Sequence, residues 1–167
     1  VSTDHYLRPW MGDVNVDIAL SGDLTRGLAG GAPWLLMEHS TSAVNWAPVN
    51  LAKEPGQMRR NSLAHVARGS DGALFFQWRA SRRGAEKFHS GMVPHAGTDS
   101  RVWREVVQLG GDLRRLSAVR GSRVGADVAM PWGSGSWWAV RLGAHPCAKR
   151  TYPHRVGGFP ARRGRAA

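Results

Sequence analysis

Residues 33–46 read PWLLMEHSTSAVNW, which is a short apolar run, one carboxylate and a polar loop that closes on an aromatic residue. The run 34–37 has the length and composition of a strand buried on both faces, as in a parallel sheet covered by helices. Because side chains alternate along a strand, Leu36 and Glu38 are expected on one face and Met37 on the other. If the strand belongs to a closed α/β barrel, Glu38 lies at its C-terminal end and faces the mouth, where catalytic groups of such barrels lie.

A second apolar segment, residues 72–81 (GALFFQWRAS), is the next predicted strand. A helix is predicted over residues 55–69, because proline suits the first turn of a helix and glycine its end. A strand–helix–strand unit of this kind requires two parallel strands and a right-handed crossover. Apolar residues at helical spacing predict two further helices, over residues 14–28 and 99–121.

The charge of the chain is strongly positive and unevenly distributed. The 167 residues carry 23 Lys and Arg against 12 Asp and Glu, a formal net charge of +11. All 12 acidic residues lie at or before Asp127, whereas seven Lys and Arg residues follow it. Such basicity makes a nucleic-acid-binding protein a candidate, with steep salt dependence and loss of binding on deletion of residues 141–167. The tryptophan-rich segments and the basic residues do not interleave on one element, which disfavours this function.

Cysteine usage and the absence of common motifs exclude several other classes. Cys147 is the only cysteine, so neither an intramolecular disulfide nor a cysteine-rich zinc site can form within the chain. No apolar run approaches the ~20 residues of a membrane helix, and residues 1–10 lack the layout of a signal peptide. Nucleotide-binding, HExxH and GxSxG motifs are absent. We therefore expect a cytoplasmic chain without metal or cofactor, truncated because it begins without Met.

Three segments of the sequence closely resemble the β-galactosidases of glycoside hydrolase family 42. They are LLMEHSTSAVNW at residues 35–46, PVN at 48–50, and the continuous run 55–106 from PGQMRRNSLAHVARGS to SRVWREV. The resemblance implies the C-terminal part of a (β/α)8 TIM barrel, an α/β fold, with the strand that ends at Glu38 as the seventh and residues 72–81 as the eighth. It also implies hydrolysis of terminal β-D-galactosides such as lactose, with Glu38 as the catalytic nucleophile, and assembly of the intact protein as a homotrimer.

The resemblance further implies three residues that bind the sugar. Trp46 offers an aromatic face to the C–H patch of a galactose ring; the alternative is a tryptophan that caps the edge of the core. Glu86 and His89 share one face of a helical turn by their i, i+3 spacing. The resemblance assigns them to galactose hydroxyls, whereas a solvated glutamate and a surface histidine are the alternative.

A retaining glycosidase needs two carboxyl groups about 5–5.5 Å apart, one as nucleophile and one as general acid/base. Glu38 must be ionised to attack, and Arg79, at the end of the neighbouring predicted strand, is a candidate for the cation that favours this state. In the family the acid/base is a Glu that follows an Asn near the end of the fourth strand. None of the other glutamates follows an Asn; they are Glu54, Glu86 and Glu105. The isolated chain is therefore expected to be inactive, which leaves open a catalytically inactive galactoside-binding remnant.

Three regions are predicted from where the resemblance weakens. Residues 1–121 form the barrel part, and residues 122–140 begin a second α/β domain of the kind used for trimer formation, with a first strand over 124–130. At residues 131–139 the chain reads PWGSGSWWA where relatives read close to LWDWESWWA. Residues 141–167 are rich in Gly, Pro and Arg without apolar periodicity, so an irregular, disordered tail is expected.

Overall fold

The computed structural model describes residues 1–7 and 13–135. The protein divides into two compact units, Val1–Ala126 and Asp127–Ala167. Residues 124–130, where the sequence predicts a strand, contain none. The predicted tail, residues 141–167, lies outside the described residues, and the boundaries at 121 and 140 remain predictions.

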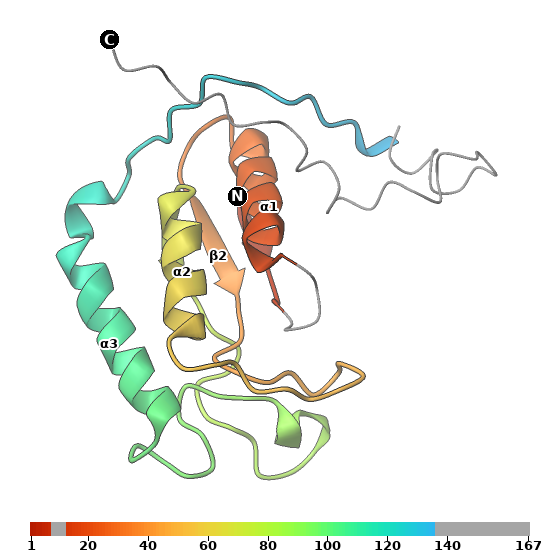
Figure 1. The fold of residues 1–167 in the computed structure, drawn as a ribbon, viewed down its shortest axis with the longest axis vertical. Coiled ribbons are helices and arrows are strands. Elements are labelled where there is room, and N and C mark those ends of the chain that lie inside the picture. Colours follow the sequence, from red (N-terminus) through yellow and green to blue (C-terminus); the bar gives the residue numbers. More distant parts are fainter. Residues whose placement is uncertain (8–12, 136–167) are drawn as a thin grey trace. The chain divides into compact units, whose positions relative to one another are not determined.

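The first unit has an α/β fold, as the sequence predicts, built on a parallel sheet with the strand order β1-β2-β3. Figure 1 shows α1 and α2 beside β2, with α3 beyond α2. The described elements, in chain order, are β1 (Ser2–Asp4), α1 (Val14–Leu28), β2 (Trp34–Glu38), α2 (Gln57–Ala67), β3 (Ser70–Ala73), the 3-10 helix η1 (Ala85–Phe88), α3 (Arg101–Arg115) and the 3-10 helix η2 (Ser117–Val119).

Local sequence signals account for the ends of the helices. The carboxylate of Asp13 caps α1 by accepting a hydrogen bond of 2.9 Å from the backbone N–H of Asn15. Gly31, with φ +77°, closes the same helix by donating its N–H to the carbonyl of Arg26. The hydroxyl of Ser100 caps α3. The helix predicted over 14–28 is thus confirmed, whereas those predicted over 55–69 and 99–121 are present in shorter form.

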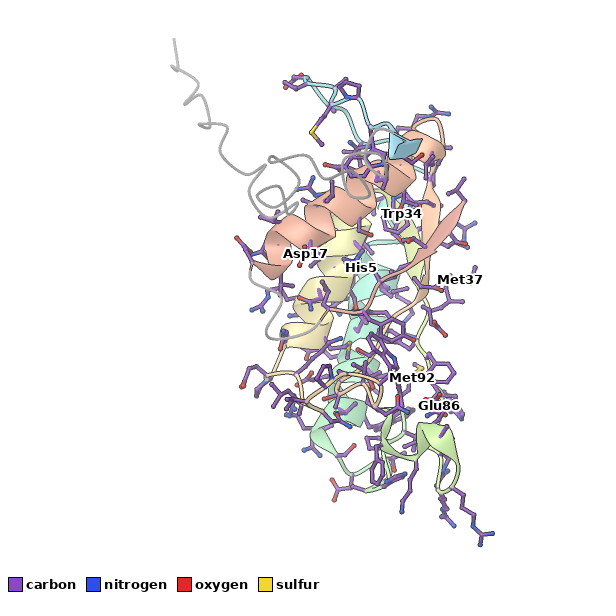
Figure 2. The ribbon with its side chains drawn as sticks, turned by 90° about the vertical axis from the view of Figure 1, so that its right-hand side faces the viewer. His5, Asp17, Trp34, Met37, Glu86 and Met92 are labelled. Atoms are coloured by element: carbon purple, nitrogen blue, oxygen red, sulfur yellow. The ribbon has the colours of Figure 1, made fainter. Side chains whose placement is uncertain are left out.

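The expectation that β2 is buried on both faces is wrong for this chain. The side chains of Trp34 and Leu36 are 1% and 0% exposed, but those of Leu35 and Met37 are 38% and 42% exposed. Figure 2 places Trp34 among the helices and Met37 at the opposite side of the sheet. Among the described residues, α1 and α2 cover the face with Trp34 and Leu36, whereas the opposite face is left open. The pairing register with β1 also shifts beside Met37, so the simple alternation does not extend to Glu38.

The second predicted strand is displaced in the structure. β3 spans Ser70–Ala73 rather than 72–81, and the apolar residues after Ala73 leave the ladder. Two hydrogen bonds still hold this segment to the end of β2: the N–H of Leu74 donates to Leu36, and that of Phe76 to His39. The apolar run therefore lines the C-terminal edge of the sheet instead of extending the strand.

The packing between α2 and α3 combines an apolar cluster with a buried polar face. Met58, Val106 and Leu109 form the cluster, and Trp103 packs against it. Leu116 lies just beyond the end of α3 and is 40% exposed. Periodicity did not predict the polar side chains that α2 buries, which are Gln57, Asn61, Ser62 and His65.

The open face predicts poor stability of the 167-residue chain on its own. Three apolar side chains that a covered sheet would bury are exposed: Leu35, Met37 and Leu74. At about 25 cal/mol per Å2, a few hundred Å2 of uncovered apolar surface forfeits several kcal/mol, comparable with the net stability of a domain. We expect calorimetry and size-exclusion chromatography to report an aggregating or molten chain. A monomer with one sharp cooperative transition would contradict this expectation.

Candidate functional site

The ring of Tyr6 lies at the centre of the candidate site, directly after β1. It meets the ring of Trp46 edge-on at 5.4 Å between centroids and the ring of His89 at 5.9 Å. Its hydroxyl hydrogen-bonds to the carboxylate of Glu38 at the end of β2. Glu86 is near enough to act electrostatically on the same hydroxyl. The structure thus brings together around Tyr6 all four residues selected from the sequence.

The electrostatics around Tyr6 keep its hydroxyl protonated. Burial raises the pKa of Tyr6 well above its usual range, and the hydrogen bond to Glu38 raises it further. The negative charges of Glu38, Asp4 and Glu86 act in the same direction. Tyr6 is therefore a fixed hydrogen-bond donor to the carboxylate of Glu38. Sequence analysis did not select Tyr6, although its place after a strand parallel to β2 could have indicated this role.

His89 and Glu86 each present a buried polar atom without a partner among the described residues. His89 is 2% exposed, so it is not a surface histidine. Its Nδ1 lies 2.9 Å from the carbonyl of Ser90, which can only accept, so Nδ1 carries a proton, and in the neutral ring Nε2 is an acceptor. Neither this Nε2 nor Oε2 of Glu86 has a hydrogen-bond partner in the described part of the chain. Orphaned buried acceptors of this kind suit the hydroxyl groups of a polar ligand.

Two loops, residues 39–53 and 76–95, hold these side chains in place through several cross-connections. The hydroxyl of Thr41 donates to the carbonyl of Gly91 at 3.1 Å, and the N–H of Ser42 donates to the hydroxyl of Ser90 at 2.9 Å. Further along, the side-chain amide of Asn50 donates to the carbonyl of Phe88 at 2.9 Å. The loop with Trp46 and the loop with Glu86 and His89 are therefore fastened to each other.

Trp46 and Arg79 differ in how far the structure bears out their expected positions. The side chain of Trp46 is 53% exposed, so it does not cap the core as a buried residue. Arg79 lines a separate pocket with Arg82 and Lys87, and the ion pairs of the described residues do not include one between Arg79 and Glu38. The expected pairing of Arg79 with Glu38 is wrong because the chain leaves the sheet after Ala73.

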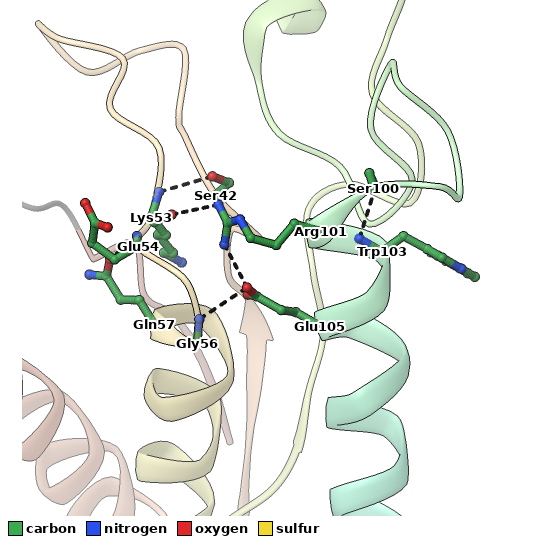
Figure 3. A network of polar contacts seen from close by, with 9 residues as sticks. All are labelled: Ser42, Lys53, Glu54, Gly56, Gln57, Ser100, Arg101, Trp103 and Glu105. Atoms are coloured by element: carbon green, nitrogen blue, oxygen red, sulfur yellow. Dashed lines mark hydrogen bonds and ion pairs between the residues drawn. The ribbon is translucent and has the colours of Figure 1, made fainter.

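Glu105 has a structural role between two helices. Glu105 pairs with Arg101 at 2.7 Å and accepts the N–H of Gly56 at 3.2 Å, so it joins α3 to the start of α2 (Figure 3).

The described residues contain no group of three or more His, Cys, Asp or Glu side chains that could hold a metal ion. Within the same residues, none of the helices has the length and apolar character needed to cross a membrane.

Comparison with known proteins defines the class to which this fold and site belong. The beta-galactosidase model of glycoside hydrolase family 42 matches residues 1–116. This chain belongs to glycoside hydrolase family 42. A beta-galactosidase from Arthrobacter sp is 58% identical over 146 residues, which are 87% of this chain and 21% of that protein. The beta-galactosidase BgaB from Geobacillus sp. is 48% identical over 153 residues, 91% of this chain and 23% of the relative.

Solved structures agree with the sequence comparison. The crystal structure of the beta-galactosidase from Bacillus circulans sp. alkalophilus superposes with a TM-score of 0.84 at 37% identity, over 93% of this chain and 23% of that one. A catalytic mutant of a GH42 beta-galactosidase from G. stearothermophilus gives 0.83 at 37% identity, over 92% and 23%. The chain thus spans less than a quarter of the length of these relatives.

Proposed function

We propose that this chain contributes the nucleophile side of a β-galactosidase active site, for hydrolysis of terminal β-D-galactosides such as lactose. The observation that carries the proposal is the convergence of Glu38, Trp46, Glu86 and His89 on Tyr6, in a member of family 42. In the proposed protein the three parallel strands are part of a (β/α)8 barrel, and β2 and β3 are its seventh and eighth strands. The intact protein is proposed to be a cytoplasmic homotrimer.

In this proposal Glu38 attacks the anomeric carbon in the first of two displacements, which together retain the configuration. A covalent galactosyl-enzyme forms as the glycosidic oxygen leaves, and water later releases galactose. Tyr6 donates its hydroxyl proton in a hydrogen bond to Glu38 and thereby orients the attacking oxygen. The exposed ring of Trp46 supports the apolar face of the sugar. The unpaired acceptors on Glu86 and His89 bind galactose hydroxyls.

The general acid/base is the part of the pair that this chain does not supply. The three other glutamates lack the Asn-Glu context of the family, and Glu105 is held by Arg101 and Gly56. This favours a second function for the isolated chain, namely galactose binding without turnover. The described residues offer no support for a nucleic-acid-binding function, since the basic tail lies outside them.

The test compares the isolated chain with a chimera in which residues 1–116 replace the matching segment of the Arthrobacter relative. The chimera restores the acid/base and the rest of the fold, so we expect it to hydrolyse lactose. The isolated chain should not, because departure of the sugar alcohol needs a proton donor. An activated aryl galactoside needs less protonation of its leaving group, so slow release of phenolate by the isolated chain is compatible with the proposal. Lactose turnover by the isolated chain at ordinary enzyme rates, or an inactive, folded chimera, would refute it.

A further inference from the structure

A buried network of polar side chains lies beneath the site and takes no part in the reaction described above. Its members are His39, Lys53, His5 and His65. His39 and His65 are 0% exposed and Lys53 is 3% exposed. All four lie within unit Val1–Ala126, so their surroundings are set by this chain itself.

The buried network joins the two segments that carry Tyr6 and Glu38, which follow β1 and end β2. The backbone N–H of His5 donates to the carbonyl of Glu38 at 2.9 Å. The carbonyl of His5 in turn lies 2.9 Å from Nδ1 of His39. His5 immediately precedes Tyr6, and His39 immediately follows Glu38. The two residues of the site that hydrogen-bond to each other are thus held from below by their direct neighbours.

The partners of His39 determine its tautomer. A carbonyl oxygen only accepts hydrogen bonds, so Nδ1 of His39 must carry the proton that it donates to His5. In the neutral ring Nε2 is then an acceptor that needs a donor. Nζ of Lys53 lies 3.4 Å from this Nε2. Lys53 is the donor that completes the hydrogen bonding of His39.

Lys53 is itself held firmly although it has no carboxylate partner among the described ion pairs. Its Nζ donates to the carbonyl of Ser40 and lies 3.1 Å from the hydroxyl of the same residue. Its backbone N–H donates to Ser42 at 3.1 Å, and its carbonyl accepts from Arg101 at 3.0 Å (Figure 3). Burying a cation without a counter-ion is costly, and an apolar side chain commonly serves packing as well or better. A purely structural role therefore does not explain a lysine at this position.

We propose that Lys53 is a positioning residue of the site, which acts through His39 to hold the end of β2 and the carboxylate of Glu38 against Tyr6. The kinetic part of this inference rests on the proposed function. Lys53 touches neither Tyr6 nor Glu38 in any described contact, so its effect is indirect. Burial lowers the pKa of Lys53 to about 7. A neutral amine can still donate to Ser40 and His39 while accepting from the Ser40 hydroxyl, so the arrangement tolerates both charge states.

The first test is kinetic and uses the chimera. Lys53→Met keeps the length of the side chain and removes its donors. Since a misplacement of the nucleophile by about 1 Å can cost 10²-fold in rate, we expect kcat to fall by about 10²-fold. We expect KM to stay within about threefold, because removal of an interaction made only in the transition state lowers kcat alone. Arg104→Met, which removes an exposed cation on α3, is the control and should leave both constants unchanged.

A double-mutant cycle tests the route through His39. His39→Gln alone should also lower kcat, and adding Lys53→Met to it should cost little more, because the two substitutions break one connection. Additive losses would overturn the route through His39. A lower melting temperature with an unchanged kcat per folded enzyme would reduce Lys53 to a structural residue and overturn the proposal.

A crystal structure of the Lys53→Met chimera separates this inference from the proposed function. We expect the hydrogen bond between Tyr6 and Glu38 to be lost, and this can be observed even if the protein has no galactosidase activity. An unchanged Tyr6–Glu38 contact would overturn the inference. If Lys53→Met does not fold, Ser40→Ala removes one partner of the ammonium group and should lower kcat by about threefold to tenfold with the fold retained. A wild-type kcat in Ser40→Ala with a lowered melting temperature would likewise contradict it.

Discussion

Glu38→Gly in the chimera is expected to lower kcat/KM for lactose by about 10⁴-fold or more, the scale of loss when a covalent nucleophile is removed. Removing this side chain leaves the sugar-binding groups in place, so binding of galactose should survive. Steady-state kinetics with lactose and calorimetric titration with galactose measure the two effects separately. Glu54→Gln, on an exposed side chain next to α2, is the matched carboxylate control and should keep the activity of the parent.

Added azide distinguishes a nucleophile from a general acid/base at this position. The small anion can occupy the space vacated by the carboxylate of Glu38 and attack the anomeric carbon from the same face. With an activated aryl galactoside, Glu38→Gly should therefore produce α-galactosyl azide, with inverted configuration. A β-azide product would assign Glu38 to the acid/base role instead. Lactose hydrolysis at the parental rate in Glu38→Gly would remove it from the reaction altogether.

The folded chimera should lose stability steeply as the pH falls from 6.5 towards 4. Burial lowers the pKa of His5 from 6.5 to about 4, helped by the charges of His65 and Lys53. Burial also holds the pKa of His39 well below 6.5 and lowers that of His65. In this window the three histidines bind protons in the unfolded chain but stay neutral in the folded chain, so the free energy of unfolding rises with pH. Each histidine contributes up to about 1.4 kcal/mol per pH unit, and three together up to about 4.

Because of Lys53, the stability of the folded chimera should also rise with pH above neutrality. The pKa of Lys53 is about 7 in the folded chain against 10.5 for an ordinary lysine, so between these values only the unfolded chain keeps the proton. Stability should therefore continue to rise from pH 7 to about 10.5. Melting temperatures of the chimera from pH 4 to 10 measure both parts of the curve.

Substitution of single histidines tests where the acid sensitivity originates. His39→Gln should flatten the acid part of the curve by about 1.4 kcal/mol per pH unit, because one proton fewer is taken up on unfolding. His95→Asn, at an exposed ring, is the control and should leave the slope unchanged. Equal slopes for His39→Gln and the parent would show that the buried network does not cause the acid sensitivity.

The sequence alone determined a part of the fold, namely one strand, three helices and the parallel direction of two strands. The apolar run after Pro33, the helix over Val14–Leu28 and the parallel pairing of two strands followed from composition, periodicity and the limits on crossover connections. These features depend on neighbours close in the chain, so they can be read locally. The candidate residues Glu38, Trp46, Glu86 and His89 came from the likeness to family 42, and the structure brings them to one place.

Tertiary structure alone decided which faces are covered and which polar groups are buried. Leu35 and Met37 are apolar like their neighbours, and only the presence of helices on one side leaves them exposed. His39, Lys53 and His65 look like surface residues in the sequence, because hydrophobic periodicity counts polar side chains as solvent-facing. Their burial depends on donors and acceptors that lie far away in the chain, such as the carbonyl of His5 for His39. Tyr6 becomes part of the site for the same reason, since its neighbours Trp46 and His89 are distant in sequence and meet it only after the strands pair.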